Sequence, residues 1–267
     1  MKLLRYQDGS GIHTGMLEDG AVRPVEHDLL SIIQSGVLPK AMGSAIPLSE
    51  VTPLLPYDVP PKIWCIGLNY KSHAEDIQAV QPEEPGSFMK PASCMFRPGG
   101  NIVLPPPAIS GDVDAEGELG VIIGRQCRYV DDAHSVIFGY TTTLDMTALD
   151  ILKKNPRYLT RAKSIDTFFS FGPVVVTTDE IADVDALEVI TEHNGAVWSR
   201  DFVRNMRHRP FELVKFHSRY MTLYPGDLIS TGCPKGARIR SGDRVRARIE
   251  GVGTLEAGVV GTPPKAD

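Results

Sequence analysis

The sequence predicts a mixed fold, mainly β with few helices, in which a small N-terminal β-rich domain precedes a larger catalytic one. Short β-branched and apolar runs recur along the chain and are separated by glycine, proline and Asp-Gly steps. Few stretches have the 3.6-residue apolar period of a helix. The 267 residues suffice for one sizeable core and a small appendage. A stretch with prolines at 53, 56, 60 and 61 predicts a stiff linker, dividing the chain into residues 1–55 and 56–267.

The first 55 residues predict two hairpins and one short helix. Strands are expected over Lys2–Tyr6, His13–Leu17 and Ala21–Pro24, because Asp-Gly steps between short apolar runs are typical of hairpin turns. The segment His27–Gly36 has a helical apolar pattern and ends at a glycine, which favours helix termination.

The second part of the chain predicts mostly short strands. They are expected at residues 62–67, 119–123, 139–147, 174–177, 188–192, 227–230 and 244–249. Helices are expected at 148–152 and, after Pro210, up to Tyr220. There is no glycine-rich nucleotide fingerprint.

Composition argues against several classes of partner. The net charge is −5, and the basic residues are scattered apart from the stretch 204–209, so general nucleic-acid binding is not expected. No apolar run approaches a membrane span, and the first residues lack the apolar core of a secretory signal. The four cysteines have no metal-ligand spacing, which favours free thiols in a reducing cytoplasm, with Cys65 and Cys127 buried.

The strongest chemical signal is Glu116-Gly117-Glu118, which runs directly into the apolar segment 119–123. Residues i and i+2 of a strand point to the same side, so the two carboxylates share one face. Burying two like charges is costly unless a cation compensates them, and carboxylate oxygens suit Mg²⁺ or Mn²⁺ rather than Zn²⁺. The alternative is an edge strand with two solvated glutamates.

A third carboxylate follows the β-branched run 139–144. Asp145 stands at the expected end of that strand and would complete a three-carboxylate site with Glu116 and Glu118. The alternative for Asp145 is a helix N-cap, a common use of this residue type.

Five segments, taken in order, resemble the fumarylacetoacetate hydrolase superfamily, in particular its bacterial 2-hydroxyhepta-2,4-diene-1,7-dioate isomerase-like branch. They are Gly67-Leu68-Asn69-Tyr70-Lys71-Ser72-His73, Glu116-Gly117-Glu118-Leu119-Gly120-Val121, Leu144-Asp145-Met146-Thr147-Ala148, Arg161-Ala162-Lys163-Ser164 and the segment 225–236. The resemblance covers most of the chain from Pro61 to Val260. It implies a β-roll catalytic domain, usually a homodimer, with the metal on the three carboxylates.

The resemblance also implies roles for six further residues. His73 would be the base, oriented by Asp76 three residues later on the same helix face, within a mobile lid over residues 71–84. Lys163 would stabilise an oxyanion, and Lys90, Thr231 and Gly232 would contact substrate. The alternatives are an exposed helix histidine, a surface lysine, a loop cation and a plain Gly-Pro turn.

Besides Asp76, which stands where the superfamily's His–Glu pair has a glutamate, three positions depart from the superfamily pattern. Leu149 and Leu152 stand where many members carry Arg and Gln, and Cys233 replaces a threonine. Leucine cannot offer the bidentate fork with which arginine holds a carboxylate, so Arg157 or Arg161 would have to substitute, or the substrate is more apolar there. A nucleophilic Cys233 is not favoured, because no base neighbours it in sequence.

These residues predict a divalent-metal-dependent hydrolase that cleaves a C–C bond in a 1,3-dicarbonyl, a small keto/enol substrate. The metal would act as a Lewis acid on adjacent substrate oxygens. One alternative is an isomerase or decarboxylase of a 2-hydroxymuconate-type diene acid at the same site. A second alternative is a non-catalytic metal-binding protein. Its only support is the absence of the superfamily's Arg and Gln at positions 149 and 152.

Overall fold

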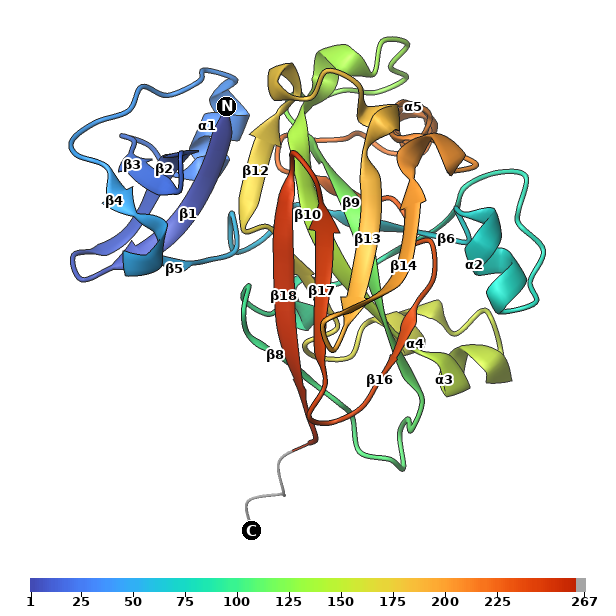
Figure 1. Ribbon diagram of the computed structural model, residues 1–267. Coiled ribbons are helices and arrows are strands. Elements are labelled where there is room, and N and C mark those ends of the chain that lie inside the picture. Colours follow the sequence, from blue (N-terminus) through green and yellow to red (C-terminus); the bar gives the residue numbers. More distant parts are fainter. Residues whose placement is uncertain (263–267) are drawn as a thin grey trace.

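A computed structural model describes residues 1–262, which form two β-sheets packed face to face (Figure 1). The larger sheet has 13 strands. Its main path runs β4 (Ile46–Pro47), β3 (Ala21–Pro24), β2 (Gly11–Glu18), β1 (Lys2–Asp8), β12 (Val174–Thr177), β10 (Ile137–Ala148), β9 (Val113–Ile123), β15 (Leu228–Ser230), β6 (Ile63–Gly67), β7 (Gly86–Met89). Three short strands pair alongside: β5 (Thr52–Pro53) with β1, β11 (Phe169–Phe171) with β10, and β16 (Ala237–Ile239) with β9.

The second sheet has five strands, in the order β14 (Ala196–Phe202), β13 (Glu188–His193), β17 (Arg244–Ile249), β18 (Gly253–Val260) and β8 (Asn101–Val103). The helices are short: α1 (Leu29–Ser35), α2 (Lys71–Asp76), α3 (Leu149–Lys154), α4 (Leu159–Lys163) and α5 (Pro210–Tyr220). Within residues 1–262, none of them has both the length and the apolar character needed to cross a bilayer. The predicted mainly β fold is confirmed.

The N-terminal segment forms the expected hairpins and is joined to the rest of the larger sheet. β1 pairs with β2 and β2 with β3, while the other edge of β1 pairs with β12 (Figure 1). The Asp28 side chain accepts a hydrogen bond from the Ser31 backbone N–H at the start of α1. Gly36 ends that helix with a left-handed backbone conformation at φ 66°. The division at residue 55 stays a prediction about folding units, because hydrogen bonds of one sheet run across it.

Two long strands, β9 and β10, form the centre of the molecule, and every residue in both is buried. Buried hydroxyl groups need partners, and two threonines of β10 find them on backbone carbonyls of other segments. Thr141 Oγ1 donates to the Val174 carbonyl at 2.7 Å, and Thr142 Oγ1 donates to the Gly253 carbonyl at 3.1 Å. The β-branched threonines therefore favour the strand conformation and also have hydrogen-bond partners for their buried hydroxyl groups.

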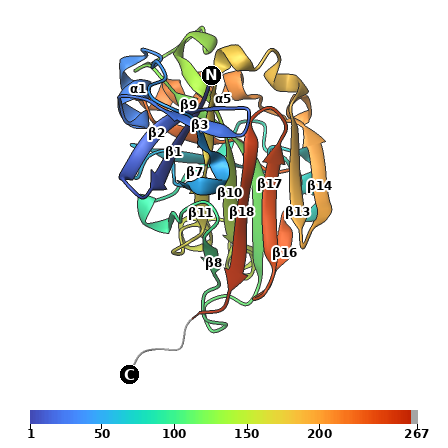
Figure 2. The same cartoon turned by 60° about the vertical axis from the view of Figure 1, so that its left-hand side comes forward.

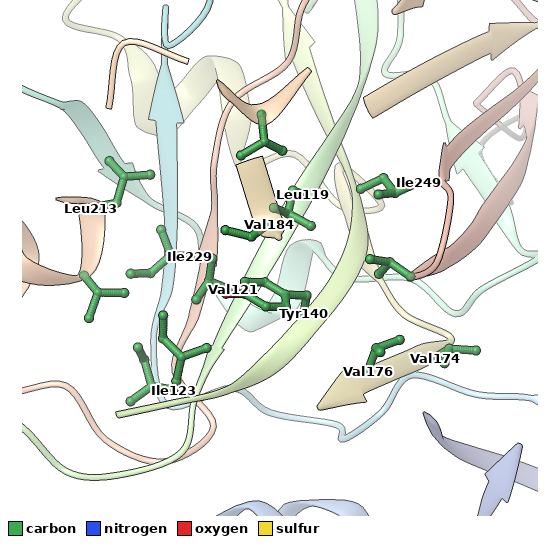
Figure 3. Packing of buried hydrophobic residues seen from close by; sticks show 14 of the residues in the cluster. Leu119, Val121, Ile123, Tyr140, Val174, Val176, Val184, Leu213, Ile229 and Ile249 are labelled. Atoms are coloured by element: carbon green, nitrogen blue, oxygen red, sulfur yellow. The ribbon is translucent and has the colours of Figure 1, made fainter. Parts of the chain in front are cut away.

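Apolar side chains fill the space between the sheets (Figure 3). Leu119 and Val121 of β9, Tyr140 of β10 and Ile249 of β17 belong to one buried cluster there. Figure 2 shows β17 and β18 running alongside β10. Full burial of each such side chain is worth about 1.5–3 kcal/mol, which accounts for the tight pairing of the layers.

Gly117 allows the second sheet to approach β9 closely. A Cβ atom at this position would lie 2.6 Å from Thr191 Oγ1 and 2.9 Å from Ala247 Cβ. Gly117 N also donates to Thr191 Oγ1 at 3.1 Å. The glycine between the two glutamates is thus required by packing, and it fixes which face of β9 carries the carboxylates.

Two sequence expectations need correction. β9 begins at Val113 rather than at Leu119, so Glu116 and Glu118 lie in the middle of a strand and not before one. Cys65 is buried as expected, but Cys127 is only half-buried, because it lies outside the core strands with exposed residues on both sides.

Candidate active site

The register between β9 and β10 gathers the three predicted carboxylates. Asp145 lies directly opposite Glu116, and Thr143 lies opposite Glu118. Because Gly117 faces the second sheet, its neighbours Glu116 and Glu118 point to the other face of the large sheet. Carboxylate oxygens of all three residues lie within 4.8 Å of one another.

None of these carboxylates is in the position that its alternative required. β9 lies between β10 and β15, so it is not an edge strand, and Glu116 and Glu118 are 5% and 1% exposed. Asp145 is 1% exposed and lies within β10 rather than at a helix N-cap. Three buried acids on one face need compensation by cations or by protons.

Two buried lysines supply part of that compensation. Lys163, on α4, donates to Glu116 Oε2 at 2.8 Å and to Asp145 Oδ2 at 3.0 Å. Lys90 donates to Asp145 Oδ1 and, at 2.8 Å, to the Phe168 carbonyl. Neither is the surface or loop cation of the alternative interpretation. Burial opposes the charged form of Lys163, but the carboxylates of Asp145 and Glu116 outweigh it and raise its pKa well above the ordinary value.

Glu118 has no cationic side-chain partner among the described residues. Its Oε2 accepts hydrogen bonds from Ser230 Oγ at 2.5 Å and from Gly232 N at 2.9 Å. Burial, with the charges of Asp145 and Glu116, raises the pKa of Glu118 to about 8. The opposite holds for Glu116, where Lys163 and then His73 outweigh burial and lower the pKa.

This imbalance fits a divalent cation. Three carboxylates face two ammonium groups, and the uncompensated charge is concentrated on Glu118. Oxygen donors from two adjacent strands suit Mg²⁺ or Mn²⁺, with other positions free for water and substrate. Glu116, Glu118 and Asp145 would hold the cation, and Lys163 and Lys90 would border it.

His73, on α2, is buried next to this cluster. It is 9% exposed, and one of its ring nitrogens lies within 4.8 Å of a Glu116 oxygen. Burial lowers the pKa of His73 against the opposing pull of Glu116. It is therefore not the exposed helix histidine of the alternative, and its position suits a neutral imidazole that takes up a proton.

The expected hydrogen bond between Asp76 and His73 does not form in residues 1–262. Asp76 Oδ1 pairs instead with Lys235 Nζ at 2.7 Å, and His73 Nδ1 has no hydrogen-bond partner. The α2 helix is only six residues long. Sharing a helix face did not suffice, because the loop after β15 offers Asp76 a cation.

Other predicted residues lie near the cluster in different roles. Gly232 faces Glu118 through its amide, whereas Thr231 Oγ1 donates to the Leu119 carbonyl at 2.8 Å and so stabilises the backbone. Leu149 is 4% exposed and Leu152 packs against the core. Arg157 and Arg161 are exposed, which gives no support to either as a replacement for the missing arginine.

Sequence reasoning missed two groups that bond the carboxylates and a further acid on the same face of β9. Ser230 bonds Glu118, and Thr147 donates to Glu116 Oε1. Asp114 lies two residues before Glu116 on the same face, is paired with Arg238 at 3.2 Å, and has its pKa raised to about 7 by burial and by Glu116. The period of two that selected Glu116 and Glu118 would also have found Asp114.

Comparisons with known proteins show the family of this chain. The family model of the fumarylacetoacetate (FAA) hydrolase C-terminal domain matches residues 62–260. Mitochondrial oxaloacetate tautomerase FAHD2A of Bos taurus is 34% identical over 266 residues, covering 92% of this chain and 84% of that one.

Two solved structures have the same fold over nearly the whole chain. The 2-hydroxyhepta-2,4-diene-1,7-dioate isomerase of Mycobacterium marinum is 35% identical with a TM-score of 0.84, covering 99% of this chain and 100% of that one. The maleylpyruvate hydrolase of Sphingobium sp. SYK-6, solved with manganese(II) and pyruvate, is 27% identical with a TM-score of 0.80, covering 98% and 100%.

Proposed function

The chain belongs to the fumarylacetoacetate hydrolase family, and we propose that it is a divalent-cation-dependent enzyme that moves a proton next to the carbonyl of a 2-oxo acid. A keto–enol tautomerase or a double-bond isomerase carries out such a transfer. Relatives that are 34% and 35% identical have names of these two classes.

The observation that carries this choice is the environment of His73. A water-activating dyad needs a carboxylate on the imidazole to orient it and raise its basicity. Here Asp76 is held by Lys235 at 2.7 Å. A buried imidazole without a bonded carboxylate suffices to carry a proton between carbon and oxygen. Proton transfer therefore needs fewer positioned groups at this site than hydrolysis does.

The residues of the cluster have distinct parts in this proposal. A bound Mg²⁺ or Mn²⁺ would supply Lewis acidity to the substrate oxygens. Lys163, which remains charged, stabilises negative charge that develops on a substrate oxygen. Lys90 donates to both Asp145 and the Phe168 carbonyl and so holds the Asp145 carboxylate in place. His73 removes the proton from the carbon next to the substrate carbonyl and returns it to the enol oxygen.

Cleavage of a C–C bond in a 1,3-dicarbonyl remains the second candidate. A solved relative with manganese and pyruvate is a maleylpyruvate hydrolase, and a Glu116 oxygen within 4.8 Å of a His73 ring nitrogen offers that imidazole a carboxylate. Loss of Arg at Leu149 counts against substrates that require a bidentate carboxylate clamp in either candidate.

The deciding experiment offers 2-oxo acids, acylpyruvates and diene diacids to the protein with Mn²⁺, and identifies products by mass and by deuterium uptake next to the carbonyl. Mass-neutral conversion with deuterium uptake, lost in Glu118→Ala, supports the proposal. Products that have gained water and split would establish the hydrolase instead. Carbon dioxide release would identify a decarboxylase, and no turnover of any substrate would contradict both candidates.

A further inference from the structure

A second set of ligand-type side chains lies beside the carboxylate cluster. His73 on α2, Glu116 on β9 and Cys233 after β15 each place one donor atom within 4.8 Å of the others, and all three are buried. The set shares Glu116 with the cluster but uses neither Glu118 nor Asp145. Three separate segments of the chain thus converge on one small volume.

The donor atoms of this set differ chemically from those of the carboxylate cluster. An imidazole nitrogen, a thiolate sulfur and one carboxylate oxygen are the ligands that zinc prefers, whereas Mg²⁺ and Mn²⁺ prefer oxygen donors alone. Cys233 is the residue that makes the difference, because it stands where the superfamily motif described above has a threonine. A hydroxyl group is a poor zinc ligand.

Independent evidence for a missing partner comes from His73. The side chain is 91% buried, since it is 9% exposed, and its Nδ1 atom has no hydrogen-bond partner in the described part of the chain. A buried ring nitrogen without a partner is costly. The carboxyl group of Asp76, three residues later in the sequence, is held by Lys235 and does not meet this need.

We propose that His73, Glu116 and Cys233 form a second cation site, selective for zinc, next to the carboxylate cluster. The ligands would close from the present separations onto one ion, and the thiol would release its proton to solvent as the sulfur binds. Three protein ligands leave a fourth position for water or a substrate oxygen, as in open zinc sites.

Occupancy of this site has a functional consequence that rests on the proposed function. His73 would bind zinc through the same side chain that is needed for proton transfer, and Glu116 would be shared between two ions. Zinc is therefore an inhibitor of the Mg²⁺- or Mn²⁺-loaded protein, acting through Cys233.

The test uses Co²⁺ as a spectroscopic substitute for zinc, with the full-length protein and without substrate. A cobalt–thiolate bond gives a charge-transfer band in the near ultraviolet that oxygen ligands do not give. We expect the band in the natural protein, its removal by one equivalent of Zn²⁺, and its loss in Cys233→Thr. The matched control is Cys127→Ser, since Cys127 is a half-buried thiol outside both sets, and it keeps the band.

Glu118→Gln separates the two sites. It removes a ligand of the carboxylate cluster only, so the thiolate band remains while Mn²⁺ binding weakens by more than about tenfold. No band in the natural protein, or a band that persists in Cys233→Thr, would overturn the zinc site. Circular dichroism of Cys233→Thr establishes that a lost band does not reflect unfolding.

Inhibition is measured separately, as the ratio of turnover with and without zinc in each variant. A ratio that approaches one in Cys233→Thr supports the inhibitory role, and equal inhibition of both proteins contradicts it. Because the cobalt spectrum needs no substrate, the zinc site is tested independently of whether the proposed reaction occurs.

Discussion

Replacing Glu118 by glutamine tests whether the carboxylate cluster carries uncompensated charge. We expect the metal-free Glu118→Gln protein to be more stable than the natural protein at alkaline pH, and to lose its stabilisation by divalent cations. The amide oxygen of the glutamine can still accept the bonds from Ser230 Oγ and Gly232 N. The substitution therefore removes a titrating group and leaves the packing largely unchanged.

The magnitude follows from the pKa of Glu118, which is raised from 4.5 to about 8 by burial and by Asp145 and Glu116. A carboxyl group with a raised pKa in the folded state contributes stability that is complete below pH 4.5 and declines as the pH rises to about 8. Each pKa unit corresponds to about 1.4 kcal/mol in the free energy of unfolding, so the full rise in the pKa of Glu118 corresponds to roughly 5 kcal/mol. Allowing for relaxation of the site, we expect the variant to gain about 2–5 kcal/mol over the natural protein near pH 8.

The assay is urea unfolding with a chelator at about pH 5 and about pH 8, repeated with Mn²⁺. A cation present at about 100 times its dissociation constant adds about 2.7 kcal/mol to the natural protein, and much less to the variant. A stability difference that does not grow with pH would refute the assignment of uncompensated charge to Glu118. Equal stabilisation of both proteins by Mn²⁺ would refute its role as a ligand.

Three further predictions follow from the same geometry. Lys163→Met should lower the free energy of unfolding by about 3–5 kcal/mol in urea titrations with chelator, since it leaves buried carboxylates unpaired; an unchanged midpoint would contradict the pairing. Gly117→Ala should cost about 1–3 kcal/mol in the same assay through overpacking, whereas Gly111→Ala, where a Cβ meets no atom within 4 Å, should cost little. In steady-state kinetics with Mn²⁺, His73→Gln should lower kcat by about 10²–10⁴, whereas Asp76→Ala should change kcat only a few-fold; equal losses would favour the hydrolytic dyad.

Much of the site was accessible from the sequence because strand geometry is local. The period of two placed Glu116 and Glu118 on one face, and the β-branched run after Gly139 predicted the strand that carries Asp145. Helix signals were also local: Gly36 ends α1, and Pro210 begins α5. Such features depend on residues within a few positions of one another, which a single chain displays directly.

Contacts between distant segments could not be predicted in this way. The pairing of Asp76 with Lys235 joins the end of α2 to a loop 159 positions later in the chain, and no local pattern distinguishes it from a bond to His73. The burial of Lys90 and Lys163 is of the same kind. Lysines are usually exposed, and here the carboxylates of Glu116 and Asp145 compensate the buried ammonium groups.

The sequence by itself determined the mainly β architecture, the three carboxylates on adjacent strands and the family, because these depend on local periodicity and on ordered motifs. Only the tertiary structure decided which charges compensate one another. The register of β9 against β10 places Asp145 opposite Glu116. Folding then brings Lys163, Ser230 and Cys233 to the same face. Coulomb and desolvation energies depend on distances in space, and those distances are set by the packing of the whole chain.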